Sequence, residues 1–168
     1  MDVQLHYIVR GSGEPLILLH GNGEDITYFG HQIVFFQKSY QVIAVDTRGH
    51  GKSPRGSAPF TISQFADDLY DFMKEHNIRR ADMLGFSDGA NIALLFTIRH
   101  PERVNRLILN GGNLNPRGLK TSVQFSLMKE YRAAKAAADT DDEAYKKMEF
   151  LHLMVKEPHI PFNELKEV

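Results

Sequence analysis

The sequence predicts an α/β fold, in which helices flank a mostly parallel sheet. Short, continuously apolar runs at residues 16–19 and 42–45 are typical of strands buried on both faces of such a sheet, and residues 104–109 predict a further strand. Helical patterns with an apolar face lie between these runs. Alternating strands and helices of these lengths imply right-handed crossovers between parallel strands.

Length and composition limit the classes of function. The 168 residues suffice for one domain, or one domain with a small insertion, and the net charge of −1 gives no reason to expect nucleic acid or an anionic membrane as a partner. The chain has no cysteine, which excludes disulfides and thiolate metal sites. No apolar run is long enough to span a membrane, and the first residues are not a signal peptide. We therefore expect a cytoplasmic protein that binds a small molecule and needs no metal or cofactor.

The N-terminal elements follow in order. Residues 3–9 alternate between apolar and polar, as an edge strand with one wet face does. After a turn, the buried strand at residues 16–19 ends at His20-Gly21-Asn22-Gly23. A loosely helical stretch leads to the strand at residues 42–45, which is followed by the glycine-punctuated loop Asp46-Thr47-Arg48-Gly49-His50-Gly51-Lys52-Ser53.

The next helix begins with Thr61 and Gln64, which predict a capping box. Its apolar residues keep a 3.6-residue period, so that one face packs on the sheet. Residues 83–95 then predict a strand, a sharp turn and an apolar, centrally placed helix, and residues 104–109 predict one more strand.

After Asn110 the pattern changes. A glycine-rich loop at residues 111–118 precedes two helical patterns, at about 120–138 and 141–156, with no strand between them. Two amphipathic helices outside the βα alternation predict a lid over the strand ends. We expect a core at residues 1–115, a helical lid at 116–162, and the start of an incomplete return to the core at 163–168.

The sharp turn within residues 83–95 contains the candidate reactive residue, a serine. Gly85-Phe86-Ser87-Asp88-Gly89 matches G-x-S-x-G between a strand and a helix, which is the pattern of a nucleophile elbow. Glycines two residues either side of the serine allow strand and helix to approach closely, and the bend lifts the hydroxyl clear of the sheet.

Three motifs in this order, His20-Gly21, the loop Asp46 to Ser53 and the elbow at Ser87, resemble the α/β-hydrolase family, specifically its lid-bearing serine esterases and aminopeptidase-like members. The resemblance spans residues 1 to about 160. It implies that Ser87 is the nucleophile that forms an acyl-enzyme, and that the backbone N–H groups of Asn22 and Asp88 form the oxyanion hole. Asp46, Arg48 and His50 are interpreted as residues that brace loops, and His20 as a structural histidine.

In this family the triad acid and histidine follow two further strands. The loop at residues 111–118 offers no Asp or Glu, and His152 and His159 fall in the expected lid. We therefore expect the N-terminal two-thirds of a serine hydrolase, lacking the last two strands and nearly inactive as it stands. The strand at residues 104–109 would then be an exposed sheet edge, prone to form a homo-oligomer or a swapped dimer.

Two alternatives compete with this hypothesis. Gly21-Asn22-Gly23 and Asp46 suggest a dinucleotide site, but Ile26 stands where its third glycine belongs. A non-catalytic protein could instead use the hydrolase scaffold to bind a ligand. Neither the histidines nor residues 139–143 have the spacing of a zinc or calcium site.

The substrate stays open among esters, thioesters, amides, lactones and carbon–carbon bonds. An apolar stripe on the expected lid mildly favours an uncharged acyl or alkyl group, although such stripes more often form a core; its members are Leu127, Met128, Tyr131, Met148 and Leu151.

Overall fold

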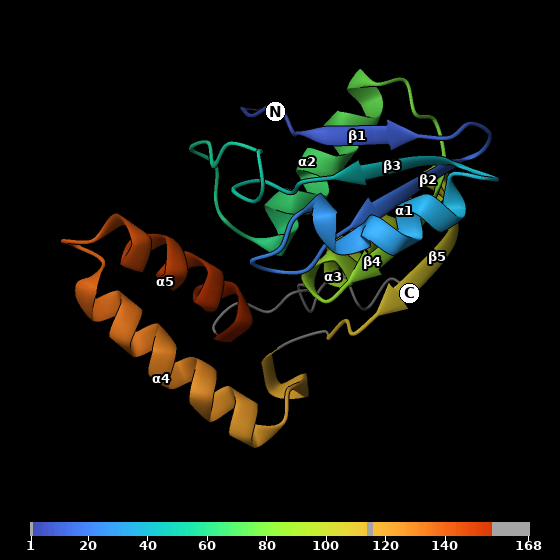
Figure 1. Ribbon diagram of the computed structural model, residues 1–168. Coiled ribbons are helices and arrows are strands. Elements are labelled where there is room, and N and C mark those ends of the chain that lie inside the picture. The colour runs from blue at the N-terminus through green and yellow to red at the C-terminus, as the bar shows by residue number, and fades with distance from the viewer. Residues whose placement is uncertain (1, 114–115, 156–168) are drawn as a thin grey trace. The chain divides into compact units, whose positions relative to one another are not determined.

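A computed structural model describes residues 2–113 and 116–155. The chain divides into two compact units, residues 1–112 and residues 113–168. The first unit contains the sheet, its flanking helices and Ser87, and the second contains a helical hairpin (Figure 1).

The first unit is built on a five-stranded sheet in the order β1-β3-β2-β4-β5. The strands are β1 (Tyr7–Arg10), β2 (Pro15–Leu19), β3 (Gln41–Val45), β4 (Ala81–Phe86) and β5 (Val104–Asn110). Only β1 is antiparallel to its neighbour, and the other pairs are parallel. The predicted mostly parallel α/β fold is therefore confirmed. The first strand is shorter than predicted, because only Tyr7–Arg10 pair with β3; Val3 and Leu5 are buried ahead of it.

Helices cover both faces of this sheet. Figure 1 shows α1 (Gly30–Phe36), which follows a short 3-10 turn η1 (Ile26–Phe29), over one face, and α2 (Ile62–Glu75) and α3 (Asp88–Arg99) over the other. On the α1 face, Ile33 packs against strand residues that share one side of the sheet: Leu16, Leu18, Val42 and Ala44. The alternating strand residues Ile17 and Met83 are fully buried as well. Burial on both faces explains why these strands are continuously apolar.

The start of α2 shows half of the predicted capping box. Thr61 Oγ1 accepts a hydrogen bond from the Gln64 backbone N–H at 3.1 Å. The Gln64 side chain does not return it, because its Nε2 donates to Asp68 Oδ1 instead, also at 3.1 Å. Asp68, which accepts this bond, lies one turn further along α2 and also forms an ion pair with a buried arginine.

That ion pair is centred on Arg48, whose side chain is fully buried in the loop after β3. Its Nε and Nη2 donate to the two carboxylate oxygens of Asp68 on α2, each at 2.7 Å, and Nη2 also donates to Asp2 Oδ1 at 2.5 Å. These bonds hold the pKa of Asp2 well below its ordinary value and raise the pKa of Arg48. Arg48 thus ties the N-terminal segment and α2 to the loop, which is the bracing role predicted for it.

The edge of the described sheet lies at β5. Within residues 2–113 and 116–155 no strand pairs with its outer side, and Ile108 and Leu109 are 52% and 43% exposed. This is the exposed apolar edge expected from the sequence. Its pairing with another chain stays a prediction.

The second unit contains a short 3-10 turn η3 (Pro116–Gly118) and two helices, α4 (Thr121–Ala137) and α5 (Asp142–Val155), close to the predicted ranges. The apolar stripe of both helices forms their shared core, which consists of Tyr131, Ala134 and Leu151 with Leu127, Met128, Met148 and Val155. The stripe is therefore explained by packing and does not support a choice of substrate. The lid role stays a prediction, and His159 and residues 163–168 lie outside the described residues.

Replacing Arg48 by Met should lower the free energy of unfolding by about 3–5 kcal/mol, because Asp68 would remain buried without its partner. Urea denaturation of the full chain measures the change. Arg10→Met is a matched control, since Arg10 is an exposed residue of β1 that forms no ion pair with any described residue, and it should change the value by less than about 0.5 kcal/mol. Equal losses in the two variants would contradict the bracing role of Arg48.

Candidate active site

Ser87 lies at the sharp turn between β4 and α3, as the elbow pattern predicts. Its backbone has φ +52° and ψ −118°, a conformation that non-glycine residues adopt only under constraint. The constraint is visible in its hydrogen bonds. Its N–H donates to the Asn110 carbonyl at the end of β5 at 2.8 Å, and its carbonyl accepts from the Ala90 N–H at 2.9 Å.

The two glycines of the elbow are required by close backbone packing. A Cβ at Gly85 would clash with the carbonyl of Gly89, and a Cβ at Gly89 would clash with the carbonyl of Leu19 at the end of β2. Strand β4, helix α3 and strand β2 therefore meet here backbone against backbone. Only glycine allows that approach.

This approach brings the turn after β2 next to the serine. Residues Gly21 to Glu24 form a tight turn, closed by a 3.2 Å hydrogen bond from the Glu24 N–H to the Gly21 carbonyl. A Cβ on Gly21 would lie only 3.1 Å from Ser87 Cβ. The structure thus places the turn that contains Asn22 against the serine. Asp88 is the first residue of α3, so its N–H has no acceptor within the helix.

His20 is a buried structural histidine, as predicted. Its Nδ1 lies 2.7 Å from the Gly21 carbonyl and must donate to it, while its Nε2 accepts from the Thr47 N–H at 3.0 Å. Burial lowers the pKa of His20, which keeps the ring neutral. Both ring nitrogens are engaged, so His20 cannot also serve as a base for Ser87.

Asp46 braces three segments, as predicted. One carboxylate oxygen accepts from His6 Nδ1 at 2.7 Å and the Lys52 N–H at 2.9 Å, and the other accepts from the Ile26 N–H at 2.8 Å. Because Asp46 is 1% exposed and fully engaged, it is not available to a ribose hydroxyl. This burial argues against the dinucleotide alternative.

His50 belongs to the same loop after β3 as Asp46. Its Nδ1 donates to the Arg48 carbonyl at 2.9 Å, and its Nε2 lies 3.4 Å from Asn22 Oδ1. Burial, reinforced by the nearby His20, lowers the pKa of His50 to about 4. The ring is therefore neutral near neutral pH, and its Nδ1 bond holds it within the bracing loop, with Nε2 beside the Asn22 side chain.

Asp88 has a second property that the sequence did not reveal. Its side chain is 6% exposed, and burial raises its pKa to about 6. Oδ1 accepts a long 3.4 Å hydrogen bond from Asn91 Nδ2, and Oδ2 has no hydrogen-bond partner among the described residues. Sequence reasoning used only the Asp88 backbone, since nothing in the local pattern shows that its carboxyl is buried.

No base for Ser87 lies in the described part of the chain. Within residues 2–113 and 116–155 the Ser87 hydroxyl makes no hydrogen bond, and His152 lies 3.3 Å from the Tyr131 hydroxyl in the second unit. His159 lies outside the described residues. The structure therefore brings together the expected nucleophile and the two expected oxyanion residues, but it does not join a histidine to them.

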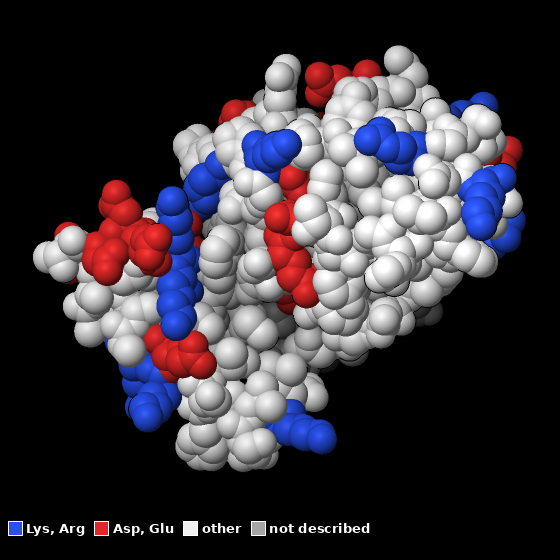
Figure 2. All heavy atoms as spheres, viewed as in Figure 1, with Lys and Arg blue, Asp and Glu red and all other residues white. Residues whose placement is uncertain are grey.

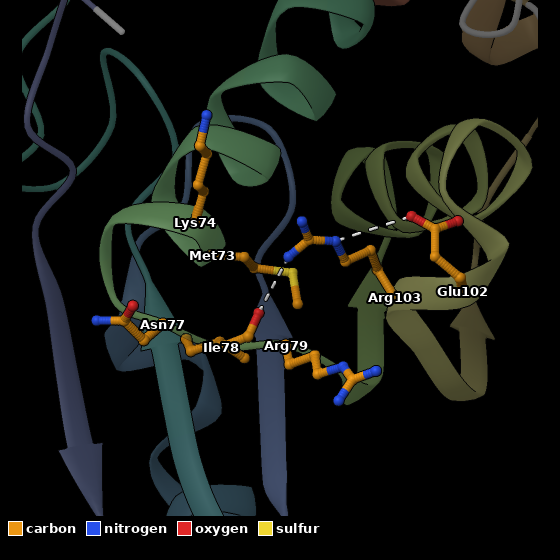
Figure 3. A pocket seen from close by; sticks show the side chains of 7 residues that line it. All are labelled: Met73, Lys74, Asn77, Ile78, Arg79, Glu102 and Arg103. Atoms are coloured by element: carbon orange, nitrogen blue, oxygen red, sulfur yellow. Dashed lines mark hydrogen bonds and ion pairs between the residues drawn. The ribbon is translucent and has the colours of Figure 1, made fainter.

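A separate hollow of about 470 Å³ lies at the opposite end of the sheet (Figure 3). Its lining residues are Met73, Lys74, Asn77, Ile78, Arg79, Glu102 and Arg103. It lies where β4 and β5 begin, whereas Ser87 follows the end of β4. The hollow is not part of the candidate active site.

The described residues contain no group of three or more His, Asp or Glu side chains that could hold a metal, and none of their helices is long and apolar enough to cross a membrane. On the face shown in Figure 2, the described basic and acidic side chains are interspersed.

Asp88→Asn should stabilise the folded chain near pH 7 by up to about 3 kcal/mol, because an ionised carboxylate is no longer buried. The folded pKa, about 6, exceeds the ordinary value of 3.8, so the folded state binds more protons between them and Asp88 stabilises it increasingly as pH falls. The gain should therefore vanish near pH 4, which urea denaturation at both pH values can measure.

His50 acts with the opposite sign. Its folded pKa, about 4, lies below the ordinary 6.5, so its contribution to stability is lost as pH falls between these values. The difference between variant and parent therefore isolates Asp88. Asp139→Asn, at an exposed position between α4 and α5, should change neither measurement. A gain for Asp88→Asn that is the same at both pH values would contradict the burial argument.

This chain spans about two fifths of the length of two relatives that it matches in sequence. It is 39% identical over 105 residues to a 2-hydroxymuconate semialdehyde hydrolase from a Pseudomonas species, covering 60% of this chain and 37% of the relative. It is 34% identical over 110 residues to a 3-oxoadipate enol-lactonase from Acinetobacter baylyi, covering 64% and 41%. A Bacillus megaterium epoxide hydrolase structure superposes with a TM-score of 0.68 at 27% identity, covering 85% of this chain and 51% of that one.

These relatives are named as hydrolases, which supports the classification of this chain as an enzyme. The matching regions span less than half the length of the two sequence relatives. The model of a protein family described as having the alpha/beta hydrolase fold matches residues 14–152, most of the chain. Together with the parallel sheet and the elbow at Ser87, this match shows that the chain belongs to the alpha/beta hydrolase fold family.

Proposed function

We propose that this chain carries the nucleophile and the oxyanion hole of a serine hydrolase that acts on a small ester-like acyl substrate. The observation that supports it best is the constrained backbone of Ser87 with the Gly21–Glu24 turn packed against it. A side chain at such a turn points away from the sheet, where its oxygen can attack a substrate. Strained backbone of this kind is concentrated at functional sites.

In this mechanism Ser87 Oγ attacks the substrate carbonyl carbon, and the carbonyl oxygen becomes negatively charged. The backbone N–H groups of Asn22 and Asp88 donate to that oxygen, and each such donor typically contributes about 3–4 kcal/mol to the transition state. The bond from the carbonyl carbon to the leaving group then breaks to give an acyl-enzyme. Water hydrolyses this ester and releases Ser87 with its proton restored.

The described residues include no group that contacts the Ser87 hydroxyl and could take its proton. His20 and His50 are engaged in the bracing loops, and among the described residues no other histidine contacts Ser87. Removing the histidine of a triad lowers kcat by several orders of magnitude. We therefore expect very slow turnover by the 168-residue chain.

The names of the relatives do not select one reaction. One names an enol-lactonase, one a semialdehyde hydrolase and one an epoxide hydrolase. An acyl-enzyme at Ser87 suits lactones and other esters, because both present a carbonyl carbon to the serine oxygen. We favour an ester-like substrate on this chemical ground.

A second candidate function is non-catalytic ligand binding on the same scaffold. The observation that favours it is the Ser87 hydroxyl without a hydrogen-bond partner among the described residues. The two functions differ in one respect that can be measured, which is whether Ser87 forms a covalent bond.

A fluorophosphonate probe tests this difference. At alkaline pH, where hydroxide can take the serine proton, we expect slow labelling of the full chain at Ser87, identified by intact mass and peptide mapping. Slow release of p-nitrophenol from p-nitrophenyl acetate should accompany it. Both signals should disappear in Ser87→Ala, because no nucleophile remains at the elbow.

Ser53→Ala is the matched control, since Ser53 is a buried serine whose hydroxyl donates to the Asp46 carbonyl, and it should leave the Ser87 adduct in place. Labelling that persists in Ser87→Ala would contradict the proposal. A parent chain that shows neither labelling nor ester turnover at Ser87 would favour the binding protein.

A further inference from the structure

The turn beside Ser87 is held by a residue that the mechanism above does not use. Glu24 Oε2 accepts a hydrogen bond from the Gly21 N–H at 2.9 Å. The backbone N–H of the same residue donates to the Gly21 carbonyl at 3.2 Å. Glu24 therefore bonds to both the N–H and the carbonyl of Gly21. Within residues 2–113 and 116–155 the Glu24 carboxylate forms no ion pair.

The hydrogen bonds to the Gly21 carbonyl determine the direction of the Asn22 N–H. The Gly21 carbonyl and the Asn22 N–H belong to one planar, trans peptide unit, so they point in opposite directions. Donors on the Gly21 carbonyl, which are His20 Nδ1 at 2.7 Å and the Glu24 N–H, thereby fix where the Asn22 N–H points. The preceding peptide unit is fixed by the Glu24 carboxylate, so the peptide units on both sides of Gly21 are held.

The clamp lies close to the nucleophile. A Cβ on Gly21 would be 2.9 Å from Glu24 Oε2 and 3.1 Å from Ser87 Cβ, so these two atoms can be no further apart than the sum, about 6 Å. A carboxylate so near the oxyanion would oppose its negative charge. Its position therefore needs a compensating role, and the bond to the Gly21 N–H supplies one.

We propose that Glu24 is a positioning residue, which clamps Gly21 so that the Asn22 N–H is preorganised toward the oxyanion at Ser87. This inference rests on the proposed hydrolase function. Its useful atom is the acceptor oxygen and not the charge. A neutral acceptor of the same shape should therefore serve as well as the carboxylate, whereas a side chain without an acceptor should not.

Two variants separate these possibilities in the fluorophosphonate assay on the full chain. Glu24→Ala should lower the maximal labelling rate at Ser87 about 10- to 100-fold, approaching the loss of one oxyanion donor, with little change in the half-saturating probe concentration. Glu24→Gln keeps an amide oxygen for the Gly21 N–H and should restore the rate to within about threefold of the parent. Glu14→Ala, at an exposed position before β2, should have the parent rate.

A second measurement tests the clamp without any reaction. In 15N-resolved NMR spectra, the Gly21 amide proton should resonate downfield in the parent and in Glu24→Gln, where it donates to the side chain of residue 24, and should move upfield in Glu24→Ala. Amide exchange at Gly21 and Asn22 should be faster in Glu24→Ala than in either of the others.

The outcomes are distinguishable. If the parent chain is labelled at Ser87 but Glu24→Ala is labelled at the same rate, the positioning role is overturned and the proposed function stands. The role is equally overturned if Glu24→Gln is as slow as Glu24→Ala, or if the Gly21 amide proton does not shift in Glu24→Ala. If Ser87 is never labelled in the parent, the proposed function fails and the positioning role falls with it.

Discussion

The constraint on which the rest of the structure depends is the backbone contact between β2, β4 and α3. Gly85 and Gly89 leave no space for a Cβ, because the carbonyls of Gly89 and Leu19 occupy it. The same contact forces Ser87 into a left-handed φ of +52° and brings the end of β2 beside it. One packing event therefore positions the serine and also delivers the turn that carries Asn22.

Around this contact, hydrogen bonds from buried polar groups hold the loops in place. Asp46 accepts hydrogen bonds from three segments, and Arg48 joins the N-terminal segment to α2 through Asp2 and Asp68. Buried charges with several partners are costly to disturb, because any broken pair leaves a desolvated group behind. The loops after β2 and β3 are thus held by buried hydrogen bonds, and His20 joins the Gly21 carbonyl to the Thr47 N–H of the loop after β3.

The sequence predicted what depends on local pattern. The glycine spacing predicted the elbow at Ser87, and the resemblance to the hydrolase family implied the bracing by Asp46 and Arg48. It could not predict what depends on distance between segments. The burial of the Asp88 carboxyl arises only when distant elements meet. The bonds from Gly21 to Glu24 and from Gln64 to Asp68 are local, but they depend on side-chain orientations that the residue types alone do not fix. The apolar stripe of α4 and α5 shows the same limit, because periodicity cannot distinguish a helical core from a ligand-lining face.

The groups that orient the Gly21–Asn22 peptide are distinct from any base that would take the Ser87 proton. Every group that orients the Gly21–Asn22 peptide, namely His20, Glu24 and the backbone around them, belongs to the first unit and is linked by contacts within it. A base must reach Ser87 Oγ from outside this set, since both nearby histidines are already bonded to loop backbone. Stabilisation of the transition-state oxygen can therefore be preorganised before a base is present. Electrostatic preorganisation requires rigid dipoles, whereas proton transfer requires only a group that arrives at the hydroxyl with a suitable pKa.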